Sequence, residues 1–295
     1  MDCPRLTVVT TNLNYGRYLA AAIESVLAQN YPNIEYFVFD AGSSDDSPAI
    51  IARYAGRLAG WHSRRDSGPA EALNLGLRRA TGEWFYYLNS DDRLLPGALH
   101  RFAAAAAVAG PRLWISGGRH EIDAEGQFLR GRLPWREDIH LFATARMWHA
   151  AEGTFLNIPS LREQGLGFDE SYQSIFDTVL YTQLDRRTPP LYVDTCFGAM
   201  RLHDRNKSGQ SNRAVNAAES ARHALACGAP PWSVRVTERL SYTRFARATE
   251  RLIARAYLAG LVGRRPAREA AVPDGKGGFT ILPMRTALRR PVSTA

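Results

Sequence analysis

Short apolar runs alternate with segments of helical periodicity along the first 115 residues, and this alternation limits the possible folds more than any other feature of the sequence. The run 6–11 (LTVVTT) is rich in β-branched residues, and the run 34–40 (IEYFVFD) is apolar and aromatic. Between them, apolar residues recur at helical spacing from 19 to 27. Strands separated by helices of this length are typical of parallel sheets. We therefore expect an α/β fold with a Rossmann-like, mostly parallel, twisted sheet flanked by helices.

The rest of the chain extends this pattern and then departs from it. Residues 123–136 are polar and irregular, and after Lys207 the sequence becomes helical and rich in arginine to about residue 264. The segment 271–295 is punctuated by Gly and Pro, which predicts a loosely ordered tail or one that lies over the domain. Further strands are expected at 60–63, 84–88 and 113–118, further helices from Ser47 and at 69–82 and 100–111, and a second group of elements at 154–160, 172–186 and 191–203.

Composition and charge exclude some classes of protein. The chain has 37 basic and 29 acidic residues, for a formal charge of +8, which permits acidic partners. Its three cysteines are far apart and form no CxxC pair, so we expect neither a disulfide framework nor a zinc site, but a reducing, cytoplasmic setting. We find no signal-peptide pattern at the start and no stretch near the roughly 18 apolar residues of a membrane span. The segment 251–262 leaves peripheral contact with the inner face of the cell membrane open.

Polar side chains follow several of the expected strands at the point where each strand ends. Thr11 ends the first strand, Asp40 ends the second, Asp91 and Asp92 follow the fourth, and Asp66 follows the third. Each residue alone is better explained by a structural role: Asp40 could start a turn, Asp66 could cap a helix, and Thr11 could be a β-branched surface residue. Ligands of open parallel sheets bind outside the carboxyl ends of the strands. The gathering of these residues at one edge therefore favours a ligand site.

The adjacent carboxylates of Asp91 and Asp92 are the sharpest of these signals. Two neighbouring like charges repel, and a divalent cation beside them lowers the cost. Mg²⁺ and Mn²⁺ are commonly held by one or two carboxylates, with water and substrate phosphates completing the coordination. The pair therefore predicts a site for a metal and a diphosphate.

Two long segments of the chain are TVVTTNLNYGRYLAAAIESVLAQNYPNIEYFVFDAGSSDDS and RDSGPAEALNLGLRRATGEWFYYLNSDD. Both resemble the family 2 glycosyltransferases, which have the GT-A fold. The subgroup resembled has an Asp-Gly-Gly-Ser-like motif after the second strand and Leu-Asn-Ser-Asp-Asp after the fourth. The similarity is close over 5–100 and looser over about 150–212. It implies a GT-A domain at 1–210, with a nucleotide-sugar half (about 1–115) and an acceptor half (about 116–210), followed by an Arg-rich helical extension and tail at 211–295.

The resemblance also implies roles for the residues at the strand ends. Thr11 and Asp40 would contact the base and ribose of a nucleotide, and Asp66 would face the base. Asp91 would hold the ribose or the donor sugar, and Asp92 would bind the Mn²⁺ or Mg²⁺ ion that bridges the two phosphates. The matched segments add two further residues to the nucleotide-sugar site, Asn14 and Asn74.

The second half resembles the acceptor side of the same family. In GLGFDESYQSIFDTVLYTQL, Asp177 matches the general base that removes the proton of the acceptor hydroxyl, a step that transfer to a sugar hydroxyl requires. An acidic residue favoured at a helix N-terminus is the structural alternative. Asp169 and Glu170 are the other candidate bases.

Two further segments complete the implied site. In MRLHDRNKSGQS, His203 would approach the metal or the diphosphate, although a structural histidine is equally compatible with the sequence. Arg201 and Lys207 of the same segment could neutralise the leaving phosphates. In HAAEGTFLNIPSL, the residues implied at the floor of the acceptor site are Glu152, Gly153 and Thr154.

The resemblance thus implies a metal-dependent, inverting glycosyltransferase of the hexosyltransferase kind. Its donor would be a nucleotide-diphospho-sugar, by default a UDP-sugar, and its acceptor a hydroxyl of a glycan or lipid-linked sugar in bacterial surface polysaccharide synthesis. A nicotinamide-dependent oxidoreductase is disfavoured because no GxGxxG follows the first strand. A nucleic-acid-binding module is disfavoured because the basic residues of 235–265 lack interleaved aromatics. A non-catalytic sugar-nucleotide-binding protein of the same fold remains an alternative.

Overall fold

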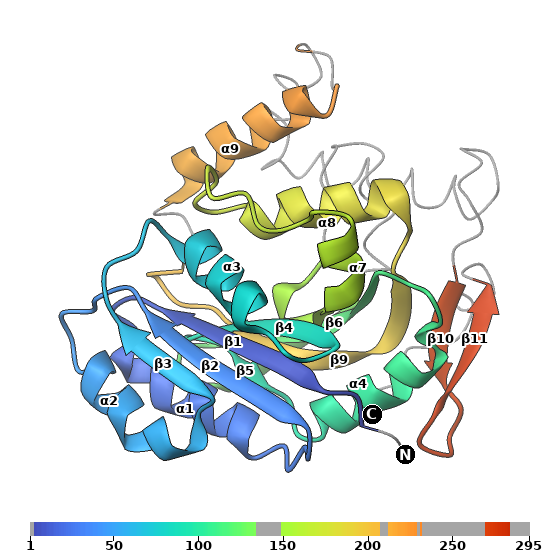
Figure 1. The fold of residues 1–295 in the computed structure, drawn as a ribbon, viewed down its shortest axis with the longest axis horizontal. Helices are drawn as coiled ribbons and strands as arrows, with labels where there is room; N and C mark the ends of the chain where they lie inside the picture. Colours follow the sequence, from blue (N-terminus) through green and yellow to red (C-terminus); the bar gives the residue numbers. More distant parts are fainter. Residues whose placement is uncertain (1–2, 134–148, 207–211, 229–230, 232–268, 284–295) are drawn as a thin grey trace.

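A computed structural model describes residues 3–133, 149–206, 212–228, 231 and 269–283. Lys207 and the segment 251–262, both named above, lie outside these residues. Within them, a central twisted sheet is covered by helices on both faces (Figure 1). The strands are β1 (Leu6–Asn12), β2 (Ile34–Asp40), β3 (Gly60–Ser63), β4 (Trp84–Asn89), β5 (Arg93–Leu94), β6 (Trp114–Ile122), β7 (Phe128–Arg132), β8 (Thr154–Asn157), β9 (Leu191–Arg201), β10 (Glu269–Pro273) and β11 (Phe279–Pro283).

The sheet is mixed, and the strands from the N-terminal part of the chain form its parallel half. Its order is β11-β10-β9-β6-β8-β4-β1-β2-β3, with β5 paired to β9 and β7 to β6. Strands β3, β2, β1 and β4 are parallel, and β8 runs antiparallel to β4 and β6. The chain goes from β1 to β2 on one side and returns to β4 on the other. This reversal places a crevice between the carboxyl ends of β1 and β4, where open α/β sheets bind ligands.

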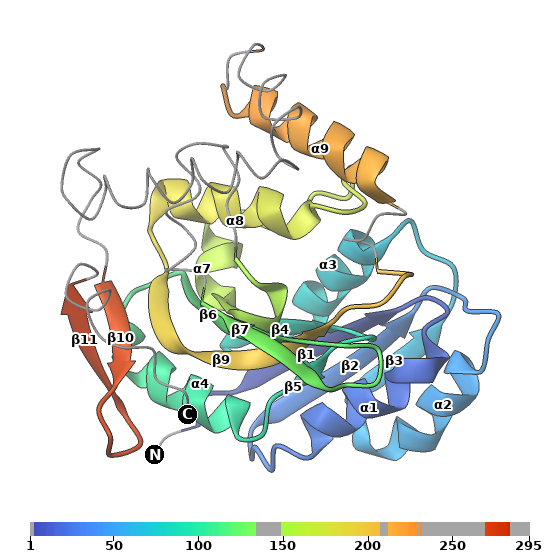
Figure 2. The same ribbon diagram turned by 180° about the vertical axis from the view of Figure 1, so that it is seen from behind.

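Alternate residues of the strands pack on opposite faces of the sheet, as the geometry of a strand requires. In β4, Trp84, Tyr86 and Leu88 belong to the core under α1, α2 and α4, whereas Phe85 and Tyr87 belong to the core under α3, α7 and α8. Figure 2 shows the two helix layers from behind. The helices are α1 (Gly16–Leu27), α2 (Ser47–Tyr54), η1 (Ala55–Arg57), α3 (Pro69–Arg79), α4 (Ala98–Ala109), η3 (Ala151–Gly153), α7 (Ile158–Glu163), α8 (Phe176–Arg187) and α9 (Arg213–Ala226).

The structure confirms the α/β class and the strand–helix alternation, and it differs from the sequence-based expectations in two segments. Residues 123–136 were expected to be irregular, but β7 pairs antiparallel with β6 across a turn in which Asp123 accepts hydrogen bonds from the backbone N–H groups of Glu125 and Gln127. Asp123 therefore stabilises the turn of a β-hairpin. The polar residues around it gave no sign of this hairpin in the sequence.

The C-terminal tail also differs from the expectation. Strands β10 and β11 form an antiparallel hairpin, and β10 pairs parallel with β9. Asp274 closes this hairpin by accepting hydrogen bonds from the backbone N–H groups of Lys276 and Gly278, while Ala270 and Ala271 are buried. The Gly-rich segment is thus the turn between two short strands, and part of the predicted extension joins the central sheet. No helix in the described part of the chain is long and apolar enough to cross a membrane.

Candidate active site

A pocket of about 840 Å³ opens at the carboxyl ends of β1 and β4. This volume lies in the range of small-molecule and cofactor sites. Its walls come from the strand ends, the loop before α3, η3, the beginning of α8, and α9. The predicted site residues that line it are Thr11, Asp66, Asp91, Asp92, Glu152 and Asp177.

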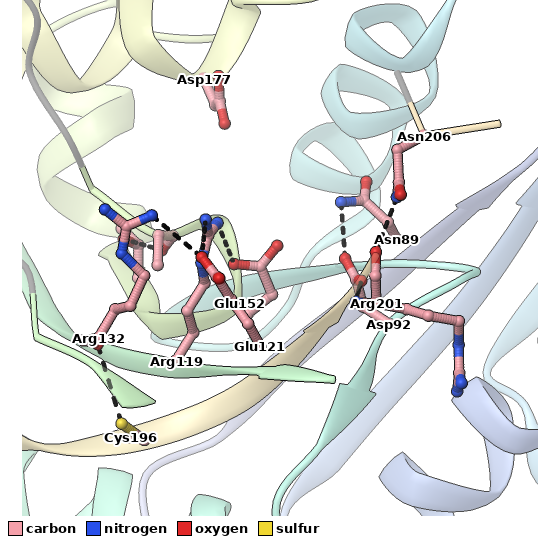
Figure 3. A network of polar contacts seen from close by, with 12 residues as sticks. Asn89, Asp92, Arg119, Glu121, Arg132, Glu152, Asp177, Cys196, Arg201 and Asn206 are labelled. Atoms are coloured by element: carbon pink, nitrogen blue, oxygen red, sulfur yellow. Dashed lines mark hydrogen bonds and ion pairs between the residues drawn. The ribbon is translucent and has the colours of Figure 1, made fainter. Parts of the chain in front are cut away.

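The end of β4 brings Asp91 and Asp92 to the floor of this pocket, where both are buried. Asp92 accepts hydrogen bonds from the backbone N–H of Arg201 (2.8 Å) and from the Asn89 amide (3.1 Å). Figure 3 shows these partners around Asp92. Asp91 lies 3.1 Å from Nε2 of His203 and accepts a hydrogen bond from the Asn206 amide. The end of β9 therefore holds Asp92, and the loop after β9 holds Asp91.

The electrostatics of the Asp pair favour a cation. Burial raises the pKa of Asp92 well above its usual value, and the charges of Asp91 and Glu152 raise it further. Burial also raises the pKa of Asp91, against the hydrogen bond from His203. Among the described residues, no group of three His, Cys, Asp or Glu side chains is arranged to hold a metal alone. Asp91 and Asp92 are the residues that would hold a cation here, with water and a diphosphate as its other ligands.

Asp40 has a different environment from the other strand-end acids. It is fully buried, does not line the pocket, and its carboxylate accepts hydrogen bonds from Asn12 (2.6 Å), Ser43 and Ser63 (2.5 Å). Burial raises the pKa of Asp40, but these hydrogen bonds outweigh it, so that the pKa is lowered. Asp40 joins the ends of β1, β2 and β3, and its contact with a base or ribose stays a prediction.

Asn14 and Asn74 also lie outside the pocket lining. Asn14 adopts a positive φ of 58° and accepts a hydrogen bond from the backbone N–H of Ser44. Asn74 pairs with Phe168 in both directions, donating to its carbonyl and accepting from its N–H, and donates to Glu170. In this structure both asparagines hold loops around the site.

Arg201 and His203 contact the Asp pair from behind the pocket lining. The Arg201 guanidinium donates to the carbonyls of Asp91 and Ala124 and lies 4.6 Å from the ring centre of Tyr18. His203 packs against the rings of Tyr15 and Tyr18 while it contacts Asp91. The structure thus brings both residues to the predicted metal and diphosphate region, with their side chains engaged by protein groups.

Gly153 and Thr154 follow Glu152 in the chain but do not line the pocket. An added Cβ at Gly153 would come within 2.3 Å of the Gly117 carbonyl oxygen. Thr154 is buried and donates to the carbonyl of Ala150. Glu152 is therefore the member of this segment that reaches the pocket.

Asp177 lies in the first turn of α8 and extends from this helix toward the pocket (Figure 3). It accepts hydrogen bonds from the Tyr87 hydroxyl (2.9 Å) and the backbone N–H of Thr178 (2.6 Å). Burial raises the pKa of Asp177, the two hydrogen bonds oppose this, and the Glu152 charge adds to it, with a net increase. A carboxylate with a raised pKa is suited to general base catalysis. Asp169 and Glu170 are exposed and lie outside the lining.

Several polar residues of the pocket are not predicted by the sequence. Arg119 lines it and forms ion pairs with Glu152 (3.3 Å) and with buried Glu121 (3.5 Å). Tyr87 contributes its hydroxyl from an apolar strand. Alternation along 84–88 could have placed Tyr87 on the face of Asp177. Nothing local marks Arg119 as a pocket residue, because its partner in the pocket, Glu152, is 33 residues away along the chain.

The fold is that of the GT-A enzymes, with a pocket at the carboxyl ends of its parallel strands, and the comparisons name the family. The family model described as glycosyl transferase family 2 matches residues 7–199. The chain belongs to this family and is a glycosyltransferase, which confirms the resemblance stated above.

Curated relatives agree with this assignment. An uncharacterized glycosyltransferase of Rickettsia typhi is 27% identical over 224 residues, covering 73% of this chain and 69% of that protein. An uncharacterized glycosyltransferase of Rickettsia felis is 31% identical over 70% of this chain, which spans only 35% of that longer protein. The succinoglycan biosynthesis protein ExoO of Rhizobium meliloti is 33% identical over 43% of this chain and 36% of its own length.

Solved structures share the fold. A mannosyltransferase of Pyrobaculum calidifontis, in complex with GDP-Man and Mn²⁺, has a TM-score of 0.57 at 22% identity, covering 90% of this chain and 77% of that one. S. aureus TarS 1-349, in complex with UDP-GlcNAc, has a TM-score of 0.56 at 16% identity, covering 92% and 95%. At these identities the likeness shows the GT-A fold and no more.

Proposed function

We propose that the protein transfers a sugar from a nucleotide-diphospho-sugar to an acceptor hydroxyl in a single displacement with inversion. The observation that carries the proposal is that two kinds of acid line one pocket. Asp91 and Asp92 come from the end of β4 in the sheet, and Asp177 comes from α8 in the helix layer above it. One set suits a diphosphate with its cation and the other suits an incoming hydroxyl.

The acids have separate roles in this mechanism. Asp92, with Asp91 beside it, would hold a Mn²⁺ or Mg²⁺ ion, which supplies positive charge to the diphosphate leaving group. Asp177 accepts the proton of the acceptor hydroxyl while its oxygen attacks the anomeric carbon. The bond from that carbon to the diphosphate oxygen breaks, and the electron pair leaves with the nucleotide diphosphate. Attack opposite the leaving group inverts the anomeric carbon.

The remaining pocket residues distribute between donor and acceptor. Thr11, Asp66 and Asp91 line the pocket and would contact the nucleotide. We propose a UDP-sugar as the default donor, with GDP-sugars as the alternative that the ligands of the solved relatives support. Glu152 also lines the pocket and would face the acceptor. The name of the Rhizobium relative supports an acceptor of the surface polysaccharide kind, either a glycan or a lipid-linked sugar. We propose that the reaction takes place in the cytoplasm, where the inner face of the cell membrane is one setting for it.

Turnover with a panel of UDP- and GDP-sugars tests this function. The purified protein is assayed with each donor and with glycan acceptors in Mn²⁺, in Mg²⁺ and in chelator. We expect transfer with one donor class, dependent on the divalent ion. We expect Asp177→Asn to retain donor binding and to lose transfer at least 100-fold, the low end for a general base.

The matched control is Asp169→Asn, which removes the same charge from the exposed loop before α8. It should transfer at the wild-type rate. If Asp177→Asn transfers normally while Asp169→Asn does not, the base is misassigned. If the wild-type protein binds a donor but transfers to no acceptor, the alternative of a non-catalytic sugar-nucleotide-binding protein holds.

A further inference from the structure

Helix α9, which follows the family-matched region, lies over the loop that leads into α8 (Figures 1 and 2). Several of its side chains contact the loop. The Arg222 guanidinium donates to the Ser171 carbonyl (2.8 Å) and lies 3.8 Å from the ring centre of Tyr172. His223 makes an edge contact with the same ring. The loop is therefore clamped from one side by a single helix.

Glu219 of α9 makes the most concentrated of these contacts. Its carboxylate accepts hydrogen bonds from three successive backbone N–H groups, those of Gln173 (2.7 Å), Ser174 (2.9 Å) and Ile175 (3.2 Å). Converging backbone N–H groups form a concave site for an anion, and hydrogen bonds to a charged acceptor are stronger than neutral ones. Ile175, the N-cap residue of α8, makes no side-chain hydrogen bond to the N–H groups at the start of this helix. Glu219 thus fixes the backbone at the point where α8 begins.

The clamped loop is part of the pocket. Gln173, Ser174 and Ile175 line it in the segment that leads through Phe176 to Asp177, and Asn216 of α9 lines it as well. Gln173 also crosses to the nucleotide side, where its amide donates to the carbonyl of Ser67 in the loop before α3 (3.1 Å). A shift of this loop would move the beginning of α8 and the bridge to Ser67 together.

We propose that Glu219 is a positioning residue for sugar transfer, which acts through the backbone of 173–175 on the placement of Asp177. This inference rests on the proposed function, because it takes Asp177 as the base. It assigns α9 to the active site, as the wall that holds the acceptor side of the pocket against the nucleotide side. A displacement of about 1 Å at a reacting group is enough to cost on the order of 100-fold in rate.

The test compares Glu219→Ala, Glu219→Gln and the control Glu163→Ala, which removes the same charge from the exposed end of α7. We expect Glu219→Ala to lower kcat for transfer by about 10- to 100-fold, within the range for such displacements, with the donor dissociation constant within about twofold of wild type. Glu219→Gln keeps one acceptor oxygen and should lose less than Glu219→Ala. Glu163→Ala should match the wild type. Amide hydrogen exchange at 173–175 should speed up in Glu219→Ala, because these N–H groups lose their acceptor.

Two results would overturn the inference. One is an unchanged kcat in Glu219→Ala, and the other is an equal loss of kcat and donor affinity, which a general loss of folded protein would give. These results are distinguishable from a failure of the proposed function. A misassigned base appears as activity in Asp177→Asn with Glu219 intact, while the exchange rates at 173–175 report the clamp independently of turnover.

Discussion

At the scale of a single residue, the hydrogen bond from Tyr87 to Asp177 should influence how the transfer rate depends on pH. Burial raises the pKa of the Tyr87 hydroxyl, so it stays a donor and stabilises the charged form of Asp177. Tyr87→Phe removes this stabilisation, and the already raised pKa of Asp177 should rise further. Because a base acts only when ionised, the acid limb of the kcat profile should move to higher pH by about half to one unit, the equivalent of one hydrogen bond.

The neighbouring tyrosine provides the control for this measurement. Tyr86 faces the other side of β4 and donates to the backbone carbonyl of Glu152. Tyr86→Phe also loses a buried hydrogen bond but leaves Asp177 unchanged, so its acid limb should stay in place. A downward shift in Tyr87→Phe would contradict the assignment of Asp177.

Burial of the Asp92 carboxylate should lower the stability of the metal-free protein, although the same carboxylate is proposed to bind the metal. Its pKa is raised on folding, so the folded protein binds this proton more tightly than the unfolded chain, and stability falls as pH rises through the raised pKa. At neutral pH without metal, Asp92→Asn should therefore raise Tm, by about 2–4 °C for each 1 kcal/mol relieved. The variant should lose the further stabilisation that Mn²⁺ and donor give the wild type. A lower Tm in the metal-free variant would show that Asp92 stabilises the empty site.

At the scale of elements, the contact between η3 and β6 has no spare volume. The Cβ of Gly153→Ala would lie 2.3 Å from the Gly117 carbonyl oxygen and 2.8 Å from that of Gly118, and neither backbone group can move cheaply. We expect a loss of about 1–3 kcal/mol in the free energy of unfolding, typical of overpacking. Gly56→Ala has open space around its added Cβ and should be within about 0.5 kcal/mol of wild type in the same denaturant titration.

Elements differ in how far the sequence predicts them, and the difference has a physical basis. The parallel strands β1, β2 and β4 are buried on both faces, so their composition alone marks them. Strand β7 is exposed along most of its length and reads as a polar loop, because its pairing with β6 leaves no apolar pattern. Strand β10 is short, and its partner β9 lies far away along the chain.

The candidate site follows the same rule at residue level. Adjacent acids at the end of an apolar run predicted the place of Asp91 and Asp92 in the pocket. The burial of Asp40 away from the pocket could not be predicted, because it depends on hydrogen bonds that Ser43 and Ser63 donate to its carboxylate. The contact of Glu219 with 173–175 joins segments about 45 residues apart and has no local signature.

At the scale of the whole molecule, one sheet and one pocket unite segments that the sequence places in separate regions. Strand β6 spans the predicted division near 115, and β10 and β11 bring the predicted extension into the sheet. Asn216 of α9 reaches the pocket from the same extension. The family model ends at residue 199, so α9, β10 and β11 lie beyond the matched region.

Calorimetric titration of nucleotide-diphospho-sugars, with Mn²⁺ and with chelator, tests the central claim most directly. The claim is that the acids at the end of β4 bind a donor diphosphate through a divalent ion. We expect the wild-type protein and Asp177→Asn to bind one donor class in Mn²⁺ and to lose at least 10-fold in affinity in chelator, equivalent to about 1.4 kcal/mol, while Asp92→Ala should bind weakly in both. Equal binding by Asp92→Ala, or wild-type binding that ignores the ion, would contradict it.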